Sequence, residues 1–422
     1  MLNENATTSA RWSRQPWLHL LQTAVRGNAT CLSDSSGDIT GLARPGSASG
    51  LYVDDRRVLH HLTLTVDGTP PEFVAADSEG PESVCLLAAR NAGDPGPDPT
   101  VQLRRTLTLV EGGLDVSVDI ASRSMAWVRF LIRLELAGDG AELHDVKSGV
   151  ANTASLPVTM ESHGRGCWVD ARHATVVETL GARCRVQGNL FVAEWEVVVP
   201  PGDSRPLDVR VRVTRTAPTG FDAECGAGGV SWDSVRVAAQ DARLDRTVRR
   251  SLTDLRHLLL TDPDNAADVF AAAGSPWYLT LFGRDSIWAA RMCLPFGTEL
   301  AGGTLRTLAR RQGRVQDPTR AEEPGKIPHE VRRTTFDDPG RLHLPPLYYG
   351  TVDATPLWVI LLHDAWRWGL GKQEIEDLER ALRAALAWMR RSVTDSDDGL
   401  LRYSDESGVG LSNQGWKDSD DS

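Results

Sequence analysis

The stretch from Gly274 to Trp288 reads GSPWYLTLFGRDSIW and places an arginine and an aspartate next to each other among aromatic residues. Arg284 and Asp285 can hydrogen-bond to hydroxyl groups. The same stretch holds three large apolar rings, at Trp277, Phe282 and Trp288. A sugar ring needs both kinds of group, because it stacks through its C–H faces and bonds through its hydroxyls. The alternative is an Asp285 that caps a helix beside an arginine in a surface ion pair.

Three later stretches repeat this combination of a carboxylate with a glycine, proline or aromatic neighbour, and they read GKIPHEVR, YYGTVDATPLW and NQGWKDS. Their carboxylates are Glu330, Asp353 and Asp418. Each stretch also has a structural interpretation. Glu330 can pair with a neighbouring arginine, Asp353 can cap a helix, and Trp416 in the last stretch can belong to a core. Taken together, the four stretches favour a shared carbohydrate site.

The first half of the chain must form the frame for these stretches, and its pattern predicts β-strands. From Leu18 to about Arg215 the apolar residues alternate with period two, most clearly in 62–66, 101–110, 114–120, 130–136, 191–199 and 207–213. Many strands joined by short turns predict a large antiparallel β-sandwich. The polar turn residues Asp54 and Asp55 predict either a tied hairpin or a loop that reaches a neighbouring domain.

The composition shifts at the glycine-rich stretch 225–229, and the pattern beyond it is helical. Apolar residues at helical spacing predict a helix over 244–259, and further helices are predicted over 285–293, 299–311, 352–368 and 375–393. We therefore expect two domains, a β-sandwich at 15–230 and a helical domain at 235–422. The intervening segment 312–350 is rich in proline, glycine and charge, and its length favours a functional loop.

Composition limits the partners and the location of the protein. The net charge of −11 disfavours nucleic acid and anionic membranes as partners and is compatible with a neutral substrate. The six cysteines show no metal-binding spacing, so we expect free thiols and neither a metal nor another cofactor. The sequence has no signal-peptide-like start and no apolar run long enough for a membrane span, which predicts a cytoplasmic protein. It does not predict an oligomeric state.

The ordered set FGRDS, GKIPHE, VDATPL and GWKDS resembles the bacterial amylo-α-1,6-glucosidase, or glycogen-debranching, type of glycoside hydrolase. RGNATCLSDSSGDI and GLYVDDRRVL extend the resemblance to the first half, so that it covers nearly the whole chain. The family is related more distantly to trehalases, glucoamylases and processing α-glucosidases. The resemblance implies an N-terminal debranching-enzyme β-domain, the start of an (α/α)6 barrel, and inverting hydrolysis of α-glucosidic bonds in an α-glucan.

The resemblance also assigns roles to residues. Inverting hydrolysis uses an acid and a base carboxyl group, which lie roughly 6.5–9.5 Å apart. By its place in GWKDS, Asp418 resembles the general acid. The substrate-binding residues that the resemblance implies are Arg284 and Asp285 as hydroxyl ligands, Trp277, Trp288 and Tyr349 as stacking surfaces, Glu330 and Asp353 as further ligands or pocket floor, and Phe282, Trp416 and Lys417 as neighbours.

The sequence departs from the family at its end. It stops at Ser422, shortly after Asp418, whereas the catalytic base of the family is a glutamate in the later part of the barrel. Asp420 and Asp421 are too close to Asp418 to act across the substrate. A barrel of twelve helices needs on the order of 250 residues, and only about 190 follow the linker. We therefore expect a shortened chain that is a poor catalyst or inactive by itself.

Two other functions fit the same residues. An inverting glycoside phosphorylase shares this architecture and needs only one protein carboxyl, because phosphate is the nucleophile. Lys417 is the only cation close to Asp418 in the sequence, which disfavours a phosphate site there. A non-catalytic glucan-binding or regulatory protein would keep the pocket without the base. Activity with and without phosphate distinguishes the first two functions, and sugar binding without turnover identifies the third.

Overall fold

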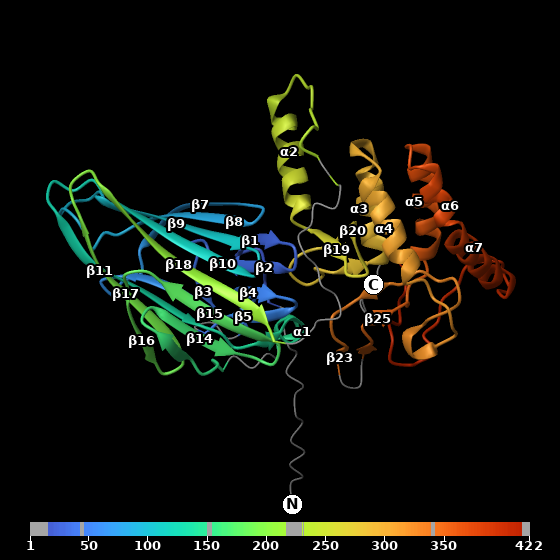
Figure 1. The fold of residues 1–422 in the computed structure, drawn as a ribbon, viewed down its shortest axis with the longest axis horizontal. Helices are drawn as coiled ribbons and strands as arrows, with labels where there is room; N and C mark the ends of the chain where they lie inside the picture. The colour runs from blue at the N-terminus through green and yellow to red at the C-terminus, as the bar shows by residue number, and fades with distance from the viewer. Residues whose placement is uncertain are drawn as a thin grey trace, which may run out of the picture.

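The computed structural model describes residues 16–42, 46–149, 154–216, 230, 232–338 and 342–415. Within these ranges the first half of the chain consists mostly of β-strands and the second half mostly of helices, and the two halves lie side by side (Figure 1). This confirms the predicted fold class, a β-rich N-terminal domain followed by a helical region. No helix in the described ranges is long and apolar enough to cross a membrane.

The β-domain contains two large antiparallel sheets. The first has the order β13-β14-β15-β18-β10-β9-β8-β7, with bounds Thr159–Ser162, Arg165–Val169, His173–Thr179, Ser204–Arg215, Gly113–Ser122, Val101–Val110, Glu82–Ala88 and Glu72–Glu79. The second has the order β16-β17-β11-β6-β3, with bounds Arg183–Gln187, Leu190–Val199, Val128–Ala137, His61–Val66 and Ile39–Thr40. One apolar core holds Leu107 and Val118 of the first sheet together with Ile132 and Trp195 of the second. The two sheets therefore pack face to face as the predicted sandwich.

A third sheet of the β-domain faces the helical region. Its order is β1-β2-β4-β5-β12, with bounds Gln22–Arg26, Ala29–Ser33, Gly50–Val53, Arg56–Leu59 and Ala141–Glu142, and β12 leads into α1, Leu143–Ser148. Tyr52 of β4 and Val146 of α1 share a small apolar cluster with Trp277 of the second half. This sheet therefore gives the β-domain a direct packing contact with the stretch that the sequence singled out.

The helical region has an apolar core of its own. Its helices are α2 (Ala242–Arg256), α3 (Gly283–Met292), α4 (Glu299–Arg310), α5 (Ala354–Arg367), α6 (Lys372–Asp377) and α7 (Glu379–Thr394), and a hairpin of β19 (Leu259–Asp262) and β20 (Asn265–Ala271) follows α2. Two expectations need correction. Leu259 lies in β19 rather than in the first helix. The helix predicted over 375–393 is broken at Leu378, whose side chain turns into the core.

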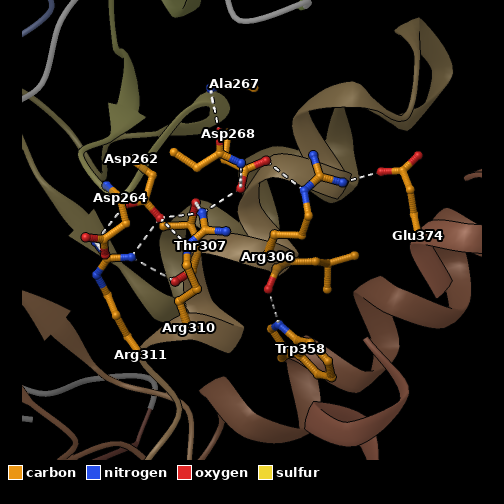
Figure 2. Close-up of polar contacts among 12 residues, drawn as sticks. Asp262, Asp264, Ala267, Asp268, Arg306, Thr307, Arg310, Arg311, Trp358 and Glu374 are labelled. Carbon is orange, nitrogen blue, oxygen red and sulfur yellow. Dashed lines mark hydrogen bonds and ion pairs between the residues drawn. The ribbon is translucent and has the colours of Figure 1, made fainter. Parts of the chain in front are cut away.

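Buried ion pairs fix the β19–β20 hairpin on α4 (Figure 2). Asp262 contacts Arg310 Nη2 at 2.5 Å and Arg311 Nη2 at 2.8 Å, and Asp268 contacts Arg306 Nε at 2.7 Å. Burial alone would raise the pKa of Asp262, but hydrogen bonds from Arg311 and Arg310 outweigh it and lower that pKa to about 2. The network therefore depends on the ionised form of Asp262.

Replacing Asp262 by alanine is expected to lower the free energy of unfolding by roughly 3–5 kcal/mol, because it removes the fully buried carboxylate that Arg310 and Arg311 share. The stabilising contribution of Asp262 should disappear as the pH falls from 3.8 toward about 2, since its folded-state pKa lies below the unfolded value. Urea unfolding followed by circular dichroism at several pH values measures both effects. Asp264→Ala is the comparison, because it removes only a 3.4 Å contact between Arg311 and a side chain that is 64% exposed. Equal losses in both variants would contradict the assignment.

Candidate active site

Three of the four singled-out stretches meet in a small antiparallel sheet. Its strands are β21 (Leu281–Phe282), β22 (Glu330–Val331) and β25 (Leu347–Tyr348). Phe282 pairs with Glu330, and Glu330 pairs with Tyr348. The described part of the fourth stretch joins them, since the Val352 amide donates to the Gln414 carbonyl at 3.0 Å. The fold therefore brings together segments that are far apart in the sequence.

Arg284, in the first turn of α3, connects these segments. Its Nε lies 2.6 Å from Asp353 Oδ2, and its Nη2 donates to the Gly415 carbonyl at 2.5 Å. Arg284 is 7% exposed, and a guanidinium group stays charged at any ordinary pH, so it requires such acceptors inside the protein. The interaction fixes the starts of α3 and α5 and the chain just before Trp416 relative to one another.

Asp353 directs its carboxylate to Arg284 rather than to the helix that it precedes. It occupies the N-cap position of α5, yet its side chain makes no capping hydrogen bond. Its second oxygen accepts from the Thr351 hydroxyl at 2.8 Å. The side chain is 24% exposed, so the pair also has a solvent-facing edge. The simple capping interpretation of Asp353 is thus corrected.

Asp285 and Trp288 lie on the accessible side of α3. Asp285 is the third residue of the helix and is exposed, so it is not the cap that the sequence suggested. A carboxylate in the first turn is still favoured by the helix dipole. Trp288 is partly exposed, and the Arg291 guanidinium lies 5.1 Å from the centre of its ring. This leaves a carboxylate and an indole ring on one helix face.

Glu330 is almost fully buried beneath the aromatic part of the site. Arg332 contacts Glu330 Oε2 through Nε and Nη2, both at 2.8 Å, whereas Oε1 has no hydrogen-bond partner among the described residues. Arg332 also lies 5.4 Å from the centre of the Phe282 ring. The predicted pairing with a neighbouring arginine is confirmed for Arg332. One oxygen of this carboxylate remains unused by the protein.

Two predicted stacking residues are placed in packing positions. Tyr349 is 2% exposed, and its hydroxyl donates to the Arg311 carbonyl at 2.6 Å. Trp277 is 6% exposed and packs against the β-domain. Neither ring offers an open face for a sugar in this structure. Three further predicted residues, Trp416, Lys417 and Asp418, lie outside the described residues.

The β-domain reaches this site through the β4–β5 hairpin. Asp54 and Asp55 form its turn with positive φ values of 51° and 64°. Asp55 contacts Arg333 Nη1 at 3.0 Å, and Asp54 lies 3.6 Å from Arg333 Nε. Burial alone would raise the pKa of Asp54, but hydrogen bonds from His173 and Arg215 hold it well below its usual range. Both expectations for this turn are met, since it ties a hairpin and contacts the neighbouring domain.

Arg333, which the sequence offered only as a possible partner of Glu330, instead contacts Asp54 and Asp55. It follows Glu330 closely in the chain, and its side chain is fully buried between the two domains. The charge complementarity of Asp54, Asp55 and Arg333 was visible in the sequence, but their separation gave no reason to pair them. No group of three or more histidine, cysteine, aspartate or glutamate side chains in the described ranges is arranged to hold a metal ion.

Comparisons with known proteins agree with this architecture. Residues 25–210 match the family described as the N-terminal domain of (some) glycogen debranching enzymes. A search of curated proteins found no match to this sequence. A bacterial glucoamylase solved in complex with acarbose aligns with 90% of this chain and 59% of its own, with a TM-score of 0.50 and 10% identity. This chain therefore spans 59% of the length of that glucoamylase, and the likeness confirms the fold.

Two further structures align with lower scores. A galactose mutarotase-like protein from Clostridium acetobutylicum covers 48% of this chain and 99% of its own, with a TM-score of 0.31 and 8% identity. A kojibiose phosphorylase candidate from the human microbiome covers 86% of this chain and 67% of its own, with a TM-score of 0.36 and 6% identity.

The contact between Asp55 and Arg333 is expected to hold the domains together. Arg333→Ala should lower the free energy of unfolding by roughly 3–5 kcal/mol, because it removes the buried cation that contacts Asp55, whereas Asp54 keeps its contact with Arg215. A double-mutant cycle with Asp55→Ala should give a coupling energy above about 1 kcal/mol. Thermal or urea unfolding measures both quantities. Arg383→Ala is the control, since its side chain is 77% exposed. If the losses in unfolding free energy from Asp55→Ala and Arg333→Ala simply add in the double variant, the interaction is refuted.

Proposed function

We propose that this protein is a glycoside hydrolase that cleaves α-glucosidic bonds of glycogen or a related α-glucan. The match of residues 25–210 to the family described as the N-terminal domain of (some) glycogen debranching enzymes supports the proposal. The observation that carries the proposal is the Arg284–Asp353 pair at the junction of the four stretches. A rigid charged pair with exposed carboxylates and an indole beside it suits the recognition of a glucose residue.

The residues around Arg284 are proposed to have different roles in sugar binding. Arg284 holds Asp353 in place, and the exposed edge of Asp353 can accept hydrogen bonds from sugar hydroxyls. Asp285 offers a second carboxylate from the same end of α3, and Trp288 offers an apolar ring. Glu330 shapes the floor through Arg332 and Phe282. We assign Arg284, Asp285, Trp288, Glu330 and Asp353 to the glucosyl site.

The proposed chemistry is hydrolysis with inversion. Asp418 donates its proton to the glycosidic oxygen as the bond to the anomeric carbon breaks. A water molecule attacks the opposite face of the sugar and gives its proton to a second carboxylate, which releases β-glucose from an α-linked substrate. The second carboxylate has no counterpart among the stretches that carry the resemblance. The binding of a glucan and its hydrolysis by these 422 residues therefore need separate measurements.

The cysteines support a reducing, cytoplasmic location. All five cysteines in the described ranges are free thiols. Burial raises the pKa of Cys31 to about 12 and that of Cys293 to about 11, so these thiols are protonated at neutral pH and unreactive. They act as small apolar core residues, which requires no oxidising compartment.

Glucose release from glycogen limit dextrin in phosphate-free buffer tests the proposal, with this chain and a version extended downstream assayed in parallel. We expect the active form to lose about 10²–10⁴-fold in rate upon Asp418→Asn, because the leaving oxygen then lacks its proton donor. Asp420→Asn is the matched control and should keep its rate. Full activity of Asp418→Asn would contradict the assignment of the acid. A requirement for phosphate would indicate a phosphorylase, and sugar binding without turnover in either version would indicate a binding protein.

A further inference from the structure

A second concave surface lies away from the candidate active site, between α4 and α7. It is a groove of about 650 Å³ whose other walls come from the chain around Gly313 and Gly325. Five arginines line it, namely Arg306, Arg310, Arg314, Arg380 and Arg391. We call it the arginine groove. None of the residues assigned above to the glucosyl site lines it.

Two of the five arginines are already neutralised. Figure 2 shows Arg306 and Arg310 turned toward the β19–β20 hairpin, where Asp262 and Asp268 are their partners, and Arg306 also contacts Glu374. These two arginines serve the fold. Their positive charge is therefore largely offset within the protein.

The other three arginines have no carboxylate partner in the described part of the chain. Arg314 and Arg380 are exposed and belong to no ion pair there, and Arg391 only donates from Nη2 to the Pro324 carbonyl at 2.6 Å. Asp377 is the one carboxylate among the lining residues of the described chain, and it accepts from Gln373 at 3.0 Å. By contrast, Arg383 on the same helix pairs with Glu379. The groove thus concentrates uncompensated positive charge on a protein whose net charge is −11.

The floor of the groove is formed by small apolar side chains. Ala381, Ala384 and Ala387 follow one another at intervals of three residues on α7, and Ala309 of α4 lines the same groove. Small side chains leave room for a carbon skeleton to lie against the helix. Guanidinium groups around such a floor can bind phosphate oxygens with paired hydrogen bonds.

We propose that the arginine groove binds a small phosphorylated metabolite, with the phosphate at the end lined by Arg314 and Arg391 and the sugar or base over the alanine floor toward Arg380. The volume lies in the range of about 300–1,000 Å³ that is usual for small-molecule sites. A nucleic acid or an anionic membrane would meet repulsion from the overall negative charge. This inference does not depend on the proposed hydrolysis, since it concerns a different surface.

The groove is also linked to the candidate active site through the main chain. Gln312 Nε2 donates to the Gly325 carbonyl at 2.9 Å and to the Ala381 carbonyl at 3.0 Å, which ties α7 to the segment that leads to Glu330. A Cβ on Gly325 would lie 2.2 Å from the Ala384 carbonyl oxygen, so that segment lies directly against α7. A ligand in the groove would therefore contact elements that support the glucosyl site.

Isothermal titration calorimetry of the purified chain with glucose 1-phosphate, adenosine diphosphate, inorganic phosphate, sulfate and glucose tests the inference. Glucose 1-phosphate or adenosine diphosphate should bind at least tenfold more tightly than inorganic phosphate or sulfate, and glucose should not bind to the groove. Arg380→Ala/Arg391→Ala should weaken that binding at least tenfold. Preference for glucose 1-phosphate would identify a sugar phosphate, and preference for adenosine diphosphate would identify a nucleotide.

The matched control is Arg383→Ala/Arg390→Ala, which removes the same charge from other faces of α7 and should leave the affinity unchanged. Arg314→Glu tests the groove from a different segment and should weaken binding as well. Equal affinity for sulfate and for the phosphorylated probes, equal losses in the control variant, or no binding of any phosphorylated probe would overturn the inference. Thermal unfolding of each variant verifies that the fold is retained.

Discussion

The buried guanidinium of Arg284 is the constraint on which the candidate site depends. An arginine cannot lose its proton inside a protein, so burial is tolerable only where carboxylate or carbonyl acceptors converge on it. Here Asp353 and the Gly415 carbonyl provide them, and they come from segments 69 and 131 residues further along the chain. Meeting this requirement aligns the starts of α3 and α5 with the last described residues. The same contact leaves Asp353 with a solvent-facing edge, which is the surface that we propose for sugar binding.

The β-domain also contacts and supports this site. The turn of its β4–β5 hairpin places two carboxylates near Arg333, and β22, which carries Glu330, ends two residues before that arginine. The apolar cluster around Trp277 adds a second contact between the domains. The N-terminal β-domain is therefore coupled to the position of Glu330. This explains why the turn residues Asp54 and Asp55 are charged although they lie in a buried interface.

Local pattern predicted the β-domain well and the helical region less completely. The strand 101–110 was predicted with its observed bounds because one face of it is buried and alternation is a local property. The break at Leu378 was missed, since it depends on where the core lies rather than on helix propensity. The clustering of Arg284, Glu330 and Asp353 followed from the motifs. The burial of Trp277 and Tyr349, by contrast, depends on the β-domain and on Arg311, which are distant in sequence. The arginine groove was equally invisible, because Arg314 lies on a different segment from Arg380 and Arg391 of α7 and the groove forms only where α7 packs beside α4.

The central claim is that the surface around Arg284 recognises glucose units. The most direct test is calorimetric titration of this chain with acarbose and maltotriose, compared with Arg284→Lys, which keeps the charge but loses the fork that joins Asp353 to Gly415. Arg383→Lys is the matched control on an exposed helix face. The account predicts binding by the wild type and the control, and at least tenfold weaker binding by Arg284→Lys. Absence of binding in the wild type, or equal affinity in all three proteins, would contradict it.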